Sequence, residues 1–362
     1  MLQSVFPQTW IGAEIMVKTA GLRGYCVKIA LISLASACHT TRGGQSTSRP
    51  RSTDGETGGV VPTQPAAASF PVQPTSAMNV VAQIEVGGDW MCIGMGSLWE
   101  PSGGKLVRVD PVLHTVITKI EASGNFCNPS PDGSAMWLAS VYQGKLYRID
   151  PATNAVTGTY DVKISSGSEG SFAVTESGVW VVTSNGNTSS GTLTRVDPAT
   201  GLILADITVA NDSHGIAAQG GFIWVTSASG NSVTQVDVAT NKVVATIAVD
   251  KGPRFIAGGE GGVWALCQGT GTVVRIDPVT GKVVATIDTK TPGGGGDIAA
   301  GEGGVWVTTF GRPVTRIDPA TNKVIAQYQG SGFGDAIRAG AGFVWVSGGR
   351  LSQIKADVIA AP

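Results

Sequence analysis

The chain has 362 residues, of which 51 are glycine and only 14% are charged, and its formal net charge is −1. This charge balance argues against a nucleic-acid partner held by bulk electrostatics, because such a protein presents a strongly basic face. Abundant glycine with few charges suits short strands joined by tight turns. We therefore expect an all-β protein.

Residues 1–38 are predicted to be a signal peptide. Three basic residues between positions 18 and 28 precede an apolar core, residues 29–37, which is too short to span a bilayer as a mature helix. Met16 is a candidate for the true start, because the residues before it include an acidic side chain and add nothing to a signal. We therefore expect export.

The predicted cleavage site lies directly before Cys38. Residues 35–37 read Ala-Ser-Ala, which fits an Ala-x-Ala site, and residues 34–38 also resemble a bacterial lipobox, although Ala35 stands where leucine is usual. Cys38 is then the predicted lipidation site, which would anchor the chain to a membrane at the cell envelope, periplasmic or at the cell surface. Residues 39–77 are rich in Ser, Thr, Pro and Gly and are predicted to be a flexible tether.

Three cysteines remain beyond Cys38, namely Cys92, Cys127 and Cys267. An odd number leaves at least one thiol unpaired in an oxidising compartment. A disulfide between Cys92 and Cys127 stays open at this point, and three buried thiols are the favoured alternative. No Cys/His spacing resembles a zinc site.

From residue 79 onward one pattern is repeated seven times, and each copy carries one tryptophan. The tryptophans are Trp99, Trp137, Trp180, Trp224, Trp264, Trp306 and Trp345, at intervals of 38, 43, 44, 40, 42 and 39 residues. A period near forty, built of short apolar runs and turn signals, indicates propeller blades of four antiparallel strands. Tryptophans placed in the middle of apolar runs are expected to pack between blades.

Five of the copies also carry an Arg-x-Asp-Pro turn, at Arg108, Arg148, Arg195, Arg275 and Arg316. Aspartate at the start of such a turn caps backbone N–H groups, and Gly or Asn at its end accepts a positive φ. His114 occupies that last position in the first copy. We interpret these charges as turn caps and contacts between blades.

The ends of the repeat predict a closed ring of seven blades over residues 78–362. The last copy lacks a clear outer strand, whereas residues 79–86 look like an outer strand and precede the first copy. This N-terminal segment should therefore complete the last blade, which removes exposed strand edges.

The repeated pattern resembles the bacterial YVTN propellers. It also resembles the streptogramin (virginiamycin B) lyases, notably in residues 214–217 and in Ile223-Trp224. The resemblance covers about residues 79 to 357 and implies a propeller. The lyases typically carry a glutamate three residues after the tryptophan. The corresponding residues here are Ser102, Ser140, Thr183, Ser227, Cys267, Thr309 and Gly348, none of them a carboxylate.

Candidate site residues are expected at the mouth of the central channel. The loops that enter each inner strand differ between copies, and a site needs unlike residues. The residues about ten positions before each tryptophan include Asp89, Trp90, Asn125 to Asn128, Glu169, His214, Arg254, Phe255, Asp297 and Asp335. Trp90, Asn125, His214, Arg254, Phe255, Asp297 and Asp335 are the predicted ligand-binding residues, and a solvated rim of loops is the alternative.

The predicted function is a binding module for a small molecule, peptide, glycan or envelope protein. The alternative is a lyase or hydrolase in which His214 acts as a base with Glu169, Asp297 or Asp335. We expect no cofactor, with Mg²⁺ required only for the lyase alternative, and a monomeric chain.

Overall fold

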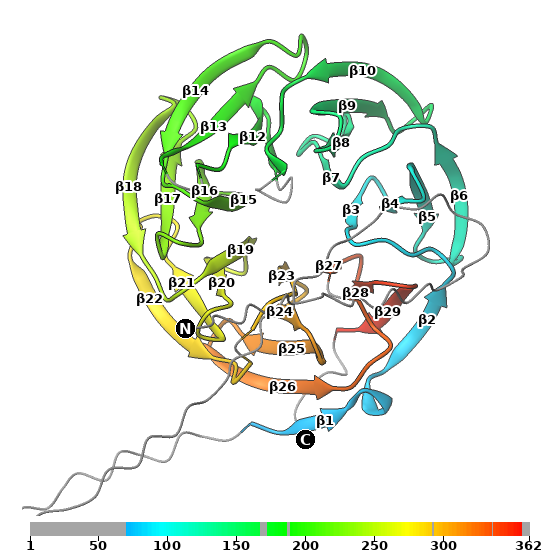
Figure 1. The fold of residues 1–362 in the computed structure, drawn as a ribbon. Coiled ribbons are helices and arrows are strands. Elements are labelled where there is room, and N and C mark those ends of the chain that lie inside the picture. The colour runs from blue at the N-terminus through cyan, green and yellow to red at the C-terminus, as the bar shows by residue number, and fades with distance from the viewer. Residues whose placement is uncertain (1–69, 167–171, 187–188, 292, 335, 357–362) are drawn as a thin grey trace, which may run out of the picture. The chain divides into compact units, whose positions relative to one another are not determined.

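The computed structural model describes residues 70–166, 172–186, 189–291, 293–334 and 336–356. These residues form seven β-sheets arranged as blades around a central axis (Figure 1). The predicted all-β, seven-bladed propeller is confirmed. The signal peptide, Cys38 and the tether up to residue 69 lie outside the described residues, as do Glu169 and Asp335.

The first three blades follow one another along the chain, each running from the inner to the outer strand. Blade 1 comprises β3 (Cys92–Gly94), β4 (Ser97–Ser102), β5 (Lys105–Asp110) and β6 (Thr115–Ile120). Blade 2 comprises β7 (Phe126–Pro129), β8 (Met136–Ser140), β9 (Lys145–Asp150) and β10 (Ala155–Asp161). Blade 3 comprises β11 (Phe172–Thr175), β12 (Gly178–Ser184), β13 (Gly191–Val196) and β14 (Ile203–Val209).

The next three blades repeat this plan. Blade 4 comprises β15 (Ser213–Gln219), β16 (Phe222–Ser227), β17 (Ser232–Asp237) and β18 (Lys242–Ala248). Blade 5 comprises β19 (Pro253–Gly259), β20 (Gly262–Cys267), β21 (Thr272–Ile276) and β22 (Val283–Asp288). Blade 6 comprises β23 (Ile298–Gly301), β24 (Gly304–Thr309), β25 (Arg312–Asp318) and β26 (Lys323–Gln329).

Blade 7 joins the two ends of the repeat. It comprises β27 (Ala336–Gly340), β28 (Phe343–Ser347), β29 (Leu351–Lys355) and, as its outer strand, β2 (Val80–Ile84). β2 pairs antiparallel with β29, as predicted for residues 79–86, so the ring is closed by hydrogen bonds between distant parts of the chain.

One strand of the structure was not predicted. β1 (Val72–Pro74) pairs parallel with β26 and adds a fifth strand to blade 6, and the 3-10 turn η1 (Thr75–Ala77) leads on to β2. These residues belong to the segment 39–77 that is predicted to be a tether, because so short a strand shows no periodicity in the sequence. No helix among the described residues is long and apolar enough to cross a membrane.

The repeated tryptophans join each blade to its successor. All seven are fully buried, as expected for residues that pack between blades. Trp99 of blade 1 shares a core with Cys127 and Leu138 of blade 2, and Trp345 of blade 7 packs in the same way with Leu98 of blade 1. The same contact that links neighbours along the chain therefore also closes the ring.

The Asp-Pro turns have the predicted chemistry. Asp277 Oδ1 accepts the N–H groups of Val279 and Thr280 at 2.9 and 2.7 Å, and these bonds hold the pKa of that carboxyl below its ordinary value. His114 has a φ of 57°, so it does occupy the left-handed position of the first turn.

Arginines of these turns clasp neighbouring blades. The Arg275 guanidinium lies 4.7 Å from the centroid of the Trp264 ring in its own blade and donates to Asn322 Oδ1 in the turn of blade 6, at 2.8 Å. Arg108 and Arg195 make the equivalent contacts with Asn154 and Asn241 of the blades that follow them. The interpretation of these charges as contacts between blades is confirmed.

Arg148 carries the same motif without the clasp. The turn of blade 3 ends in Gly201, which offers no side-chain acceptor, and Arg148 instead donates to Thr157 Oγ1 of its own blade at 3.1 Å. Arg275 and Arg148 therefore share one sequence motif but differ in their hydrogen-bond partners, which makes them a matched pair for mutation.

We predict that Arg275→Ala lowers the free energy of unfolding by about 2–4 kcal/mol, because it removes a charged hydrogen bond and a cation–π contact. Arg148→Ala should change it by less than about 1 kcal/mol. Thermal unfolding followed by circular dichroism measures both variants. Equal losses in the two would contradict the clasp.

Candidate functional site

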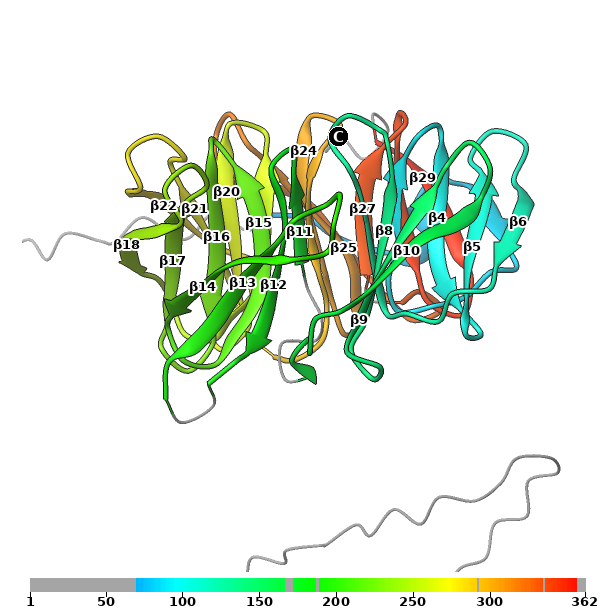
Figure 2. The same cartoon turned by 90° about the horizontal axis from the view of Figure 1, so that it is seen from above.

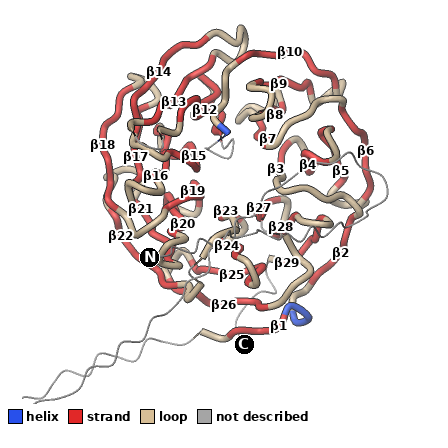
Figure 3. The backbone as a smooth tube through the Cα atoms, viewed as in Figure 1, coloured by secondary structure: helices blue, strands red, loops and turns tan. Residues whose placement is uncertain are grey.

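The strands run between two rims, which are seen edge-on in Figure 2. Figure 3 shows the loops that join successive strands and the inner strands around the central opening. One rim carries the regular Asp-Pro turns. The other carries the loops that precede each inner strand and the loops between second and third strands, as the alternation of strand direction requires.

A pocket of about 550 Å³ opens at this second rim, and we call it the mouth pocket. It is lined by Asp89, Trp90, Asn125, Phe126, Val141, Tyr142, Ser166, Arg254, Phe255, Gln268, Gly295, Gly296, Asp297, Phe310 and Ala336. The structure thus brings together the sequence-predicted residues Trp90, Asn125, Arg254, Phe255 and Asp297. Sequence reasoning missed Tyr142, Gln268 and Phe310 because they come from loops between second and third strands, for which no position was specified.

Aromatic side chains dominate the apolar part of the mouth pocket. Tyr142 and Phe310 are 86% and 73% exposed, which is unusual for large aromatic residues. Trp90 is buried and packs edge-on against Phe126, with ring centroids 4.7 Å apart. Flat apolar surfaces beside amide and charged groups are typical of ligand pockets.

Below the mouth pocket the inner strands enclose a second cavity of about 320 Å³, which we call the channel cavity. Trp90, Phe255 and Asp297 line both spaces. The inner strands of blades 3 to 6 contribute mainly alanine, isoleucine, valine and glycine to its wall. A molecule that enters the mouth pocket therefore meets a channel beneath it in which most of the side chains are apolar.

An ion pair stands where the two spaces meet. Arg338 Nη1 donates to Asp297 Oδ2, and the guanidinium lies 4.0 Å from the centroid of the Trp90 ring. Asp297 also accepts the N–H groups of Ile298 and Ile337 at 2.8 and 3.2 Å. Burial raises the pKa of Asp297, while Arg338 and these N–H groups oppose that rise by stabilising the carboxylate.

Sequence reasoning missed Arg338, although the repeat contains the signal that could have found it. Arg338 lies opposite Trp345 in the register of its blade. The residues opposite the tryptophan in blades 3 to 6 are Ala173, Ala217, Ala257 and Ala299. Blades 1 and 2 have Cys92 and Asn128 at this position, so Arg338 is the one charged residue among the seven. A charge at a position that is otherwise uncharged is the kind of departure from a repeat that marks a site.

Glu100 is a second departure from the repeat. The residue after the tryptophan is apolar in the six other blades, whereas Glu100 is fully buried between blades 7 and 1. Burial raises its pKa to about 8, so the carboxyl is protonated at neutral pH.

A protonated Glu100 explains the bonds around it. Ser347 Oγ lies 2.7 Å from Glu100 Oε1 and 2.6 Å from the carbonyl oxygen of Gly88. A hydroxyl has only one proton to donate, so a neutral carboxyl can donate to Ser347 while Ser347 donates to Gly88. Gly88 directly precedes Asp89 and Trp90, so this relay holds the loop that delivers two residues of the mouth pocket.

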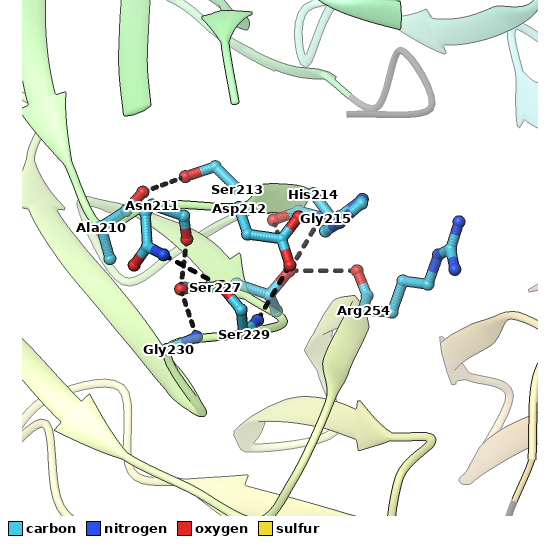
Figure 4. Close-up of polar contacts among 11 residues, drawn as sticks. Ala210, Asn211, Asp212, Ser213, His214, Gly215, Ser227, Ser229, Gly230 and Arg254 are labelled. Atoms are coloured by element: carbon cyan, nitrogen blue, oxygen red, sulfur yellow. Dashed lines mark hydrogen bonds and ion pairs between the residues drawn. The ribbon is translucent and has the colours of Figure 1, made fainter. Parts of the chain in front are cut away.

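His214 is placed differently from the other predicted residues. It is 8% exposed and lines neither cavity, and its Nε2 lies 2.9 Å from Asp212 Oδ1. Asp212 in turn accepts the N–H of Ser229 at 3.0 Å (Figure 4). The side chain of Arg254 extends away from this cluster in the same view.

This geometry does not favour the lyase alternative. His214 is engaged with Asp212 and lies outside the cavities that Asp297 lines, while Asp297 is engaged with Arg338. Among the residues that the structure describes, no three His, Cys, Asp or Glu side chains are grouped as a metal would require. Cys92, Cys127 and Cys267 are free and buried, so the structure contains no disulfide between the first two.

Comparison with known proteins identifies the fold and no family. No family model matches the chain, and no curated protein matches it, so the resemblance to YVTN propellers and streptogramin lyases has no further support. Among solved structures, hydrazine synthase of Kuenenia stuttgartiensis is similar with a TM-score of 0.60 and 14% identity over 77% of this chain and 98% of that one.

The β-propeller domain of Cps50 (Swd1) from Myceliophthora thermophila is similar with a TM-score of 0.62 and 11% identity, over 77% of this chain and 99% of that one. At such identities the likeness concerns the propeller alone.

Glu100 generates a prediction about stability. Between the ordinary pKa of a glutamate, 4.5, and the value of about 8 in the folded chain, the native state keeps a proton that the unfolded chain releases, so stability falls as pH rises through this range. Glu100→Gln removes that proton linkage and keeps a hydrogen-bonding side chain of similar shape.

We expect the stability of Glu100→Gln relative to the wild type to rise by about 2–5 kcal/mol between pH 5 and pH 8.5. Melting temperatures measured across this range test it. Glu85→Gln, at an exposed carboxylate paired with Arg350, is the control for loss of one acidic group. Parallel pH profiles for wild type and Glu100→Gln would show that Glu100 is not a buried neutral acid.

Proposed function

We propose that this chain is an exported cell-envelope propeller that binds a ligand in its mouth pocket. The proposed binding function rests mainly on the contrast between the two rims of the propeller. One rim repeats the same turn from blade to blade, whereas the other gathers Trp90, Arg254, Phe310 and further unlike side chains around one opening. A scaffold requires repeated contacts, and recognition requires different ones.

The mouth pocket has the composition of a recognition site. Its exposed aromatic rings offer flat apolar surfaces at little entropic cost, and Asn125, Gln268 and Arg254 supply polar groups beside them. A small molecule, the end of a peptide or a glycan matches this combination. We do not propose a lyase, because the candidate base His214 lies outside both cavities.

Binding is tested by a screen of aromatic and sugar fragments against the mature chain, with ligand-observed NMR as the readout. Tyr142→Ala and Phe310→Ala remove exposed side chains and should leave the fold intact. We expect each to weaken binding of the selected fragments about tenfold, since loss of such a contact costs about 1–2 kcal/mol.

Val279→Ser is the matched control, because Val279 is 83% exposed in a turn of the opposite rim. Fragments that bind equally to wild type and to both aromatic variants would contradict a site in the mouth pocket. A screen that yields no fragment at all would contradict the binding function.

Export and anchoring are proposed from the sequence, through the signal peptide at residues 1–38 and lipidation of Cys38. Expressed in a bacterial host, the wild-type chain should incorporate labelled fatty acid and sediment with the membranes. Cys38→Ala should lose the label and stay soluble. An uncleaved, unlabelled wild-type chain in the cytoplasm would contradict the proposal.

A further inference from the structure

Arg338 is held in one position by three groups. Its guanidinium face lies on Trp90, and its Nη1 donates to Asp297 and to the carbonyl of Ile337. Trp90 is itself fixed, because its Nε1 donates to the carbonyl of Cys127 at 3.3 Å. The arginine is therefore preorganised, and little side-chain entropy remains to be lost when a ligand binds.

The other edge of this guanidinium has no partner. Within the described ranges, Arg338 Nε and Nη2 make no hydrogen bond, although Arg338 lines the channel cavity and its side chain is 18% exposed. These two nitrogens carry three N–H donors in a planar fork that matches the two oxygens of a carboxylate. These donors are accessible from the cavity, and a charged fork that is fixed in a cavity wall is available to a ligand with matching oxygens.

Apart from Asn128, the other side chains that line the channel cavity are apolar. Arg338 and Asp297 are its only charged lining residues in the part of the chain that the structure describes. The side-chain amide of Asn128 is already used, since it donates to the carbonyl of Phe172 at 2.6 Å. A cavity of about 320 Å³ with such walls holds a small apolar group, near the lower end of known ligand sites.

The charges of Arg338 and Asp297 favour one class of ligand over the others. An ammonium group would face Arg338 and find Asp297 already engaged by Arg338 and two N–H groups. A dianionic phosphate would bring a second negative charge close to Asp297. A carboxylate carries one charge and fits the open fork.

We propose that the channel cavity binds a small molecule with an apolar body and one carboxylate, and that Arg338 holds the carboxylate through Nε and Nη2. This inference rests on the proposed binding function and adds the chemical class of the ligand. The mouth pocket then admits the molecule, and the row of alanines in blades 3 to 6 leaves room for its apolar part.

The test compares three probes of one shape, 4-phenylbutyrate, 4-phenylbutanol and 4-phenylbutylamine, by isothermal titration calorimetry with the mature chain. We expect the acid to bind at least tenfold more tightly than the alcohol or the amine. The double variant Asp297→Asn/Arg338→Gln removes both charges and keeps a hydrogen-bonded pair, so it avoids an unpaired buried charge. It should lose the preference for the acid.

Two further variants test the site without relying on correct folding of the double variant. Ala218→Phe places a large apolar side chain in the channel cavity from an exposed position on β15 and leaves both charged residues unchanged, and it should weaken binding of the acid at least tenfold. Arg316→Gln removes an arginine that lies on Trp306 at 5.0 Å, outside the lining of either cavity, and should leave binding of the acid unchanged.

The outcomes separate this inference from the proposed function. Equal binding of acid and alcohol, or undiminished binding of the acid by the double variant or by Ala218→Phe, would overturn the carboxylate site. If fragments still bind in a manner that depends on Tyr142 and Phe310, the binding function stands while the carboxylate site fails.

Discussion

The structure depends on the contact between each blade and the next. A blade buries one face of its second strand through a tryptophan that packs into the following blade. In blades 1, 3 and 5 a turn arginine also stacks on that tryptophan and reaches the next turn. Because the last tryptophan, Trp345, finds the same environment against blade 1, the ring is closed by the interaction that builds it. Apolar burial supplies most of the stability, and the arginine clasps add charged hydrogen bonds between neighbouring sheets.

A scaffold built by repetition shows its special positions as departures from the repeat. Glu100 replaces an apolar residue, and Arg338 replaces an alanine. Glu100 lies in the first blade and Arg338 in the last, which are neighbours in the ring, and both contribute to the electrostatic environment of the buried Cys127 thiol. A buried acid and a buried base are costly in an apolar core, so each is compensated by hydrogen bonds or an ion pair.

These compensations also shape the mouth of the channel. The relay from Glu100 through Ser347 fixes the loop before Trp90, and Trp90 in turn supports the guanidinium of Arg338. Asp297 joins blade 6 to the inner strand of blade 7 by accepting the N–H of Ile337. The contacts that hold the first and last blades together therefore also fix the side chains of the proposed ligand site. The site is rigid without any contact from a ligand.

The sequence by itself determined the number of blades, the turn chemistry and the closing strand, because each depends on a local pattern repeated seven times and read against its own copies. It also indicated which rim holds unlike residues. Only the tertiary structure decided that Arg338 pairs with Asp297, that His214 turns to Asp212, and that residues 72–74 extend blade 6. These contacts join residues far apart in the chain, or depend on the direction of one side chain, and neither is encoded in periodicity or spacing.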